Sequence, residues 1–200
     1  MKKLILLAVL ALALPMAVFA NSSIDYTNSG GILSGTTSGL SLSGSNLIAV
    51  NGNSGLISGL DLGSVLFQTG ALMSGSLEKG GMFSAGGFLE IIGNGSNGVP
   101  NGTMFIGTFT SPVKWTMIPL SNGTHNYTLT GALEGLVGTG FVTTGATVQL
   151  TINTGRGFFN GCTRISSGDT NVVVPEPGSL SLLGTGLLAL GGMIRRKLKA

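Results

Sequence analysis

Charged residues, cysteine and histidine are scarce in this sequence. Only 8% of its 200 residues are Asp, Glu, Lys or Arg, whereas a typical soluble domain has about 25%. The single Cys and the single His exclude an intrachain disulfide, a cysteine-based zinc site and any metal site that needs two histidines. We therefore expect neither a metal nor a cofactor.

Basic residues are especially few in the body of the chain. Residues 21–174 contain four basic and six acidic side chains, a formal charge of −2. A nucleic-acid-binding domain needs a clustered basic face, so we expect no nucleic-acid partner. A helical bundle is also disfavoured, because 35 residues are Gly and each interior Gly costs a helix about 1 kcal/mol.

The first 20 residues have the pattern of a secretory signal. Two lysines precede an apolar run over residues 4–14, Pro15 interrupts the run, and small residues follow it. We predict a signal peptide over residues 1–20, which signal peptidase removes between Ala20 and Asn21. A permanent N-terminal membrane anchor is the alternative, but the apolar run is short for a membrane span.

A second apolar run occupies residues 178–194. As a helix, its 17 residues would span roughly 25 Å, against about 30 Å for the bilayer core, and flanking basic side chains extend that reach. The tail over residues 195–200 contains Arg195, Arg196, Lys197 and Lys199. Because positive charge stays in the cytoplasm, we predict a transmembrane helix with the tail inside and the body outside. A buried core helix is the alternative, although it would not need a basic cluster at its end.

A Pro-rich segment precedes the second apolar run, with the sequence Val174-Pro175-Glu176-Pro177. Together with the short helix and the basic tail, it resembles the PEP-CTERM sorting signal of exported bacterial proteins over residues 174–200. The resemblance implies processing near Pro175-Glu176-Pro177 by exosortase, a membrane enzyme that is similar to a cysteine transpeptidase. The helix would then be a temporary hold in the inner membrane. The resemblance also implies a Gram-negative bacterium that makes exopolysaccharide, and it assigns no activity to the body.

Residues 21–173 show the period-two alternation that is typical of β-strands. The alternation is clearest over residues 147–153, where Val148, Leu150 and Ile152 would face a core. Glycine-rich turns separate the other expected strands, at residues 65–69, 71–77, 88–92, 104–109, 113–117, 125–130 and 171–174. This spacing predicts an all-β domain, with an antiparallel sandwich as the expected architecture and a β-solenoid as the alternative. Residues 32–62 are less regular, and there we expect irregular sandwich strands.

The body offers no strong catalytic motif. His125 falls in an expected hairpin turn, and no Gly-x-Ser-x-Gly motif accompanies it, so we expect an exposed turn residue and no catalytic residue. For Cys162 we expect a small buried residue or an idle thiol, with a cross-link between two chains as the alternative. A glycan-active hydrolase would need two carboxylates about 5 to 9 Å apart, and it stays a minor alternative.

Four aromatic residues are candidate glycan contacts, because aromatic faces stack on the apolar faces of sugars: Trp115, Tyr127, Phe158 and Phe159. Ordinary core positions are the alternative for all four. Phe158 and Phe159 are adjacent, so they cannot both point inward on a regular strand. One of them is then exposed, unless a bulge buries both.

These observations predict an exported, non-enzymatic surface or matrix protein. Its expected role is structural or adhesive in exopolysaccharide or biofilm, and a carbohydrate-binding module is the alternative. The expected partners are signal peptidase, exosortase and the inner membrane, with exopolysaccharide as a further candidate. We expect an inner-membrane intermediate, followed by delivery to the cell envelope, the surface or the extracellular matrix.

Overall fold

The computed structural model describes residues 22–52, 55–138, 140, 142–143 and 145–174. The predicted signal peptide with its cleavage site, the predicted transmembrane helix and the basic tail lie outside these residues. Within the described ranges, no helix has both the length and the apolar character needed to cross a membrane. Ser23–Val174 form one compact unit.

This unit is built from antiparallel strands and one 3-10 turn, η1 (Ser96–Gly98). The strands are β1 (Ser22–Ser29), β2 (Ile32–Thr36), β3 (Gly39–Gly52), β4 (Gly55–Thr69), β5 (Leu72–Ser76), β6 (Gly80–Phe83), β7 (Gly87–Asn94), β8 (Asn101–Phe109), β9 (Val113–Pro119), β10 (His125–Val137), β11 (Gly145–Asn153), β12 (Cys162–Arg164) and β13 (Ser167–Val174). Each strand expected from the sequence lies within or overlaps one of these. The prediction of an all-β, antiparallel domain is therefore confirmed.

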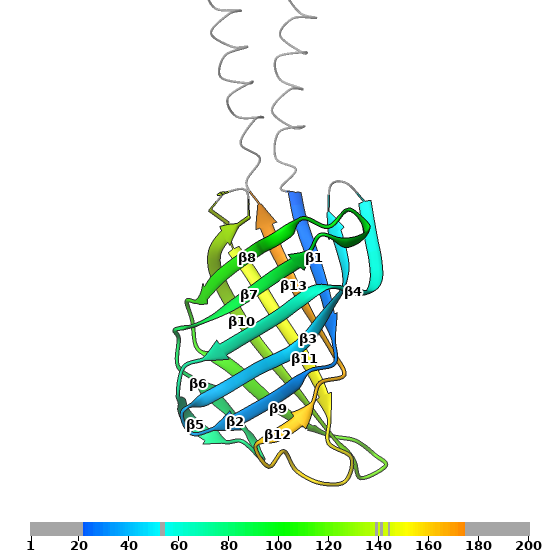
Figure 1. Ribbon diagram of the computed structural model, residues 1–200. Helices are drawn as coiled ribbons and strands as arrows, with labels where there is room; N and C mark the ends of the chain where they lie inside the picture. Colours follow the sequence, from blue (N-terminus) through cyan, green and yellow to red (C-terminus); the bar gives the residue numbers. More distant parts are fainter. Residues whose placement is uncertain (1–21, 53–54, 139, 141, 144, 175–200) are drawn as a thin grey trace, which may run out of the picture. The chain divides into compact units, whose positions relative to one another are not determined.

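All thirteen described strands belong to one sheet, in the order β11-β13-β1-β3-β4-β7-β8-β10-β9-β6-β5, while β12 and β2 extend it beside β3. β10 also pairs with β11, so the sheet closes on itself. In Figure 1, β3, β4, β7 and β8 cross in front of β1, β13, β11 and β10. The expected architecture is corrected here: the strands form neither two separate sheets nor solenoid turns.

The length of β10 makes this closure possible. Its first part, through Leu133, pairs with β11, and the last part, from Leu133 to Val137, pairs with β8. The same first part also pairs with β9 on its other edge. One strand thereby joins both ends of the closed sheet and starts the branch that contains β9, β6 and β5.

The core follows the alternation of the strands. Val148, Leu150 and Ile152 are at most 5% exposed, so the predicted inward face of β11 is confirmed. Phe67 and Phe109 come from different strands and meet edge to face, with ring centroids 6.4 Å apart. Such pairs stabilise a core beyond the apolar area that they bury.

The irregular first third of the body forms two long strands, β3 and β4. Leu40 and Leu42 are buried in the first part of β3, whereas Ser45 and Leu47 are buried in the next part. The buried residues thus change from even-numbered to odd-numbered positions. The cause is a bulge at Gly44, where β3 has one more residue than β4 and φ is +62°. A bulge shifts the inward face by one residue, which explains why the period-two signal was weak here.

Candidate functional site

Three of the four candidate glycan contacts lie in the core. Trp115, Tyr127 and Phe159 are at most 1% exposed and pack against one another. The Trp115 ring stacks on Tyr127 with a centroid distance of 5.0 Å and meets Phe159 edge-on at 5.3 Å. These three side chains therefore cannot form an exposed sugar-stacking surface, and the candidate set is corrected to Phe158 alone.

Phe158 points outward while Phe159 points inward, as expected for adjacent residues. Phe158 is 48% exposed, and its ring stacks on His125 with a centroid distance of 4.5 Å. The backbone N–H of Phe159 donates to the Tyr127 hydroxyl at 3.1 Å, which fixes the chain at this point. One exposed ring beside a histidine is a smaller platform than the four aromatics predicted.

His125 and Cys162 lie at the start of β10 and of β12. His125 is half-buried at the start of β10, and its Nδ1 lies 3.2 Å from the carbonyl oxygen of Gly157. Cys162 is exposed on β12, so it is not the small buried residue that was one expectation, while the idle thiol and the cross-link between two chains stay as predictions. Among the described residues, no group of three or more His, Cys, Asp or Glu side chains is placed to hold a metal ion.

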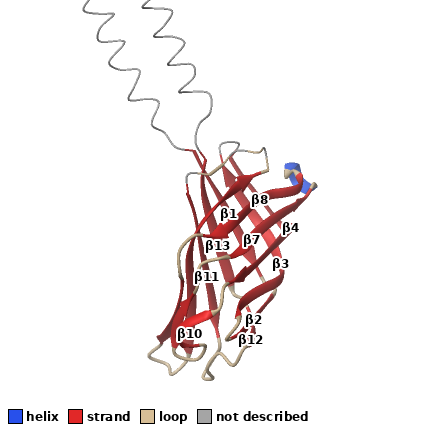
Figure 2. Ribbon diagram, turned by 90° about the vertical axis from the view of Figure 1, so that its left-hand side faces the viewer, coloured by secondary structure: helices blue, strands red, loops and turns tan. Residues whose placement is uncertain are grey.

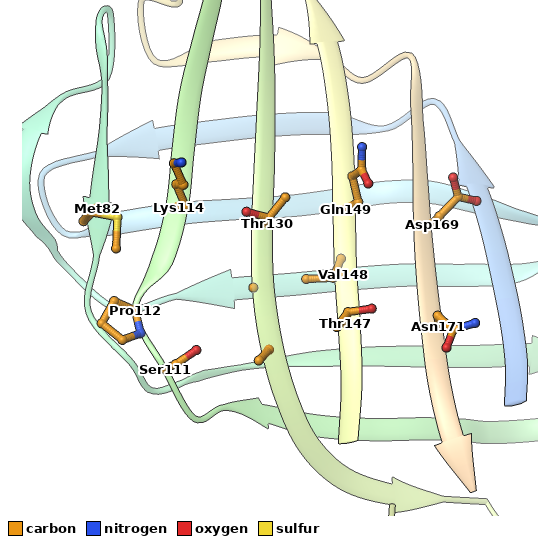
Figure 3. A pocket seen from close by; sticks show the side chains of 12 residues that line it. Met82, Ser111, Pro112, Lys114, Thr130, Thr147, Val148, Gln149, Asp169 and Asn171 are labelled. Carbon is orange, nitrogen blue, oxygen red and sulfur yellow. The ribbon is translucent and has the colours of Figure 1, made fainter. Parts of the chain in front are cut away.

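An open groove of about 630 Å³ lies on the outer face of β9, β10, β11 and β13. Its centre is a row of four side chains that face each other across neighbouring strands. The register pairs Lys114 with Thr130, Thr130 with Gln149, and Gln149 with Asp169. Directly opposite residues of antiparallel strands point to the same face, and Figure 3 shows these four side chains side by side.

A second, parallel row widens the groove. Here Ala132 is paired with Thr147, and Thr147 with Asn171. Met82 and Pro112 supply apolar surface at one end of the groove (Figure 3). The groove thus combines hydroxyl, amide, ammonium and carboxylate groups on one face of neighbouring strands.

The acidic end of the groove continues onto β1, which is the neighbour of β13. Partial burial raises the pKa of the Asp25 carboxyl above its usual range, and the nearby Asp169 carboxylate raises it further. A hydrogen bond with the Asn171 side chain partly offsets both effects. Lys114 is the basic residue at the opposite end of the row, so one basic and one acidic side chain stand at its two ends.

The Thr, Gln and Asn side chains of the groove can both donate and accept hydrogen bonds. The alternation over residues 147–153 places Thr147 and Gln149 on the outward face of β11 and contains no further signal of a site. The groove is not visible in the sequence, because its rows depend on the register of four strands, and the alternation within each strand does not contain that register.

The sorting segment is the second functional feature, and residues 173–197 match the PEP-CTERM protein-sorting motif. A motif of this kind marks the cargo of a protein-sorting system. The chain carries a PEP-CTERM signal, which confirms the resemblance and implies export through a membrane-anchored intermediate and processing by exosortase. No curated protein and no solved structure is significantly similar to the chain, and the β domain remains an unassigned passenger.

Proposed function

We propose that this chain is a non-enzymatic protein of the cell surface or extracellular matrix, where its β domain is structural or adhesive in exopolysaccharide or biofilm. The sorting motif is the observation that carries the proposal, because it follows the β domain directly and addresses an exported passenger. Only 8% of the residues are charged, which supports a role among hydrated polymers. Few charged side chains then have to lose bound water when the domain contacts a polymer.

The intact mass of the protein in each fraction of its native host tests the proposal. We expect a form in the surface or medium fraction that begins at Asn21 and lacks the apolar run and basic tail. Attached glycan would add to that mass without changing either end. A chain that still ends at Ala200 and stays in the membrane fraction would contradict sorting, and the helix would then be a permanent anchor.

Carbohydrate binding by the groove is the second candidate function. The row from Lys114 to Asp169 supports it, because hydrogen-bonding side chains occur at regular strand spacings along one face. Adjacent strands lie about 4.8 Å apart, which is close to the length of a sugar unit. A specific binding module predicts saturable affinity for one glycan, whereas an adhesive role predicts weak contacts with many.

A glycan-active hydrolase is the minor alternative, and one pair of carboxylates gives it a concrete test. Asp25 and Asp169 interact electrostatically at the edge of the groove, and glycoside hydrolysis uses two carboxylates. We expect no release of reducing ends when the protein is incubated with exopolysaccharide. Release that is abolished by Asp169→Asn would overturn the non-enzymatic assignment.

A further inference from the structure

Of the described residues that line the groove, Lys114 is the only basic one. It belongs to β9, and the register places it between Met82 on β6 and Thr130 on β10. From Thr130 the row continues through Gln149 to Asp169, over β10, β11 and β13, which run side by side (Figure 2). A ligand that lies along the row therefore meets an ammonium group at one end and a carboxylate at the other, as Figure 3 shows.

The Lys114 ammonium group has no acidic neighbour on the described strands beside it. Neither Met82 nor Thr130, which are directly opposite, is charged. The diagonal positions hold small or uncharged residues: Gly80, Ser84, Thr128 and Ala132. The carboxylate of the row, on Asp169, is three strands away, or roughly 14 Å at the usual strand spacing. Exposed charges at that separation are largely screened at physiological salt, so the ammonium group can pair with an anionic group of a ligand.

The end of the groove that contains Lys114 is also partly apolar. Met82 and Pro112 line it, and Ala132 contributes only a methyl group to the surface beside them. A sugar ring that bears a carboxylate presents both kinds of surface, because its C–H groups are apolar and its carboxylate is charged. This end therefore matches an anionic sugar more completely than it matches a small inorganic anion.

The other end of the groove has the opposite preference. The carboxylates of Asp169 and of Asp25, on the neighbouring strand β1, interact electrostatically. A negative charge of a ligand at this end would be repelled by both, and such like-charge contacts reduce affinity. The two ends of the groove therefore distinguish the two directions in which a charged chain can lie.

We infer that the groove binds an acidic glycan in one direction, with an anionic sugar at Lys114 and neutral sugars over Thr130 and Gln149. The inference rests on the proposed carbohydrate binding by the groove, and it adds the class and the direction of the glycan. The sugar carboxylate pairs with the ammonium group, and the hydroxyls of the neutral sugars bond with the Thr and Gln side chains. A polymer with a charge on every sugar fits less well, because it also places charge beside Asp169.

Titration calorimetry of the protein with a matched pair of probes tests the class of glycan. The first probe is an oligosaccharide of gellan, in which one glucuronate occurs among neutral sugars. The second is the same oligosaccharide after reduction of the glucuronate carboxyl group to an alcohol, which removes the charge and keeps the backbone. We expect the charged probe to bind about two- to fivefold more tightly, as for an exposed ion pair. Added salt is expected to remove this difference.

Two lysine variants assign the preference to one side chain. Lys114→Gln is expected to bind both probes with the same affinity. Lys79→Gln makes the same change in charge at an exposed residue that does not line the groove, and it is expected to keep the preference of the wild-type protein.

Asp169→Asn tests the direction of the bound chain. The probe is oligogalacturonate, which is charged at every sugar and therefore places a carboxylate beside Asp169. We expect the variant to bind this probe about two- to fivefold more tightly than the wild-type protein does. An unchanged affinity would overturn the assigned direction.

The results separate this inference from the function on which it rests. If the wild-type protein binds the charged and the reduced gellan probes equally, the acidic class is overturned, while carbohydrate binding still stands. A preference that survives in Lys114→Gln also overturns the inference, because the anionic sugar then lies elsewhere. If neither gellan probe binds, the proposed carbohydrate binding by the groove fails together with the inference.

Discussion

Trp115 and Tyr127 stack in the core on the neighbouring strands β9 and β10, with ring planes only 18° apart. Each ring also has a polar group that holds a distant loop. The Trp115 indole N–H donates to the Leu77 carbonyl at 2.8 Å, and the Tyr127 hydroxyl donates to the Glu78 carbonyl at 2.6 Å. The Tyr127 hydroxyl accepts from Phe159 as well. The pair therefore fixes both the turn after β5 and the segment before β12.

Tyr127→Phe tests this arrangement. The ring and its packing remain, but the Phe159 N–H and the Glu78 carbonyl lose their partner, which costs about 1–3 kcal/mol of the free energy of unfolding. Equilibrium urea unfolding measures the change. Tyr26→Phe is the control, because Tyr26 is also buried but lies on β1 and makes neither of these two hydrogen bonds. Equal losses in the two variants would contradict the role assigned to the Tyr127 hydroxyl.

Gly63 is a position that only glycine can occupy without rearrangement. Its φ is +149°, and a Cβ atom there would overlap with the carbonyl oxygen of Ile92 on β7. Gly63→Ala is expected to lower the free energy of unfolding by about 3 kcal/mol, from backbone strain and overpacking together.

Gly145 provides the control for this substitution. A Cβ atom at Gly145 meets no heavy atom within 4 Å, and its φ is not in the left-handed region. Gly145→Ala is therefore expected to change the stability by less than about 1 kcal/mol. If both alanine variants unfold at the same urea concentration, steric restriction at Gly63 is not what selects glycine there.

The sequence predicted the strands and their inward faces where apolar and polar residues alternate cleanly, as at Val148, Leu150 and Ile152. It did not predict the closed sheet, because closure depends on pairs such as β13 with β1, which join the two ends of the domain. The bulge at Gly44 hid the pattern of β3, since one added residue exchanges the inward and outward faces.

The candidate site was harder to predict than the strands. Aromatic residues serve both sugar stacking and cores, so the chemistry of Trp115, Tyr127 and Phe159 did not distinguish the two roles. Their burial decided it. The groove residues could not be predicted for a different reason. Lys114, Gln149 and Asp169 are ordinary outward residues of their own strands, and only the register of the strands places them in one row.

The raised pKa of Asp25 predicts a pH dependence of stability. Burial, and then the charge of Asp169, raise the pKa in the folded protein above the ordinary value of 3.8. The folded state therefore holds the proton more tightly than the unfolded state. The contribution of Asp25 to stability is then complete below pH 3.8, falls as the pH rises, and is lost above the folded-state pKa.

Asp25→Asn checks this sign. The variant is expected to be more stable than the wild-type chain at pH 7 and equal to it at pH 3, because the neutral amide avoids both the burial of charge and the repulsion from Asp169. Thermal unfolding across this pH range measures the difference. Asp61→Asn, on an exposed part of β4, is the control. A destabilised Asp25→Asn variant at pH 7 would show that the hydrogen bond with Asn171 outweighs the two unfavourable effects.

The proposed carbohydrate-binding function of the groove predicts what a single side chain contributes. Gln149 occupies the middle of the row, between Thr130 and Asp169, so a polysaccharide chain that follows the row has to pass over its amide. Gln149→Ala removes hydrogen bonds worth about 1 kcal/mol in total, which is about a fivefold loss of affinity. Titration calorimetry with exopolysaccharide from the native host measures this loss of affinity.

Thr108→Ala is the control for general surface effects, because Thr108 is an exposed residue of β8 that does not line the groove. Equal affinities of the two variants would place carbohydrate binding elsewhere, and the exposed Phe158 ring would be the next position to change.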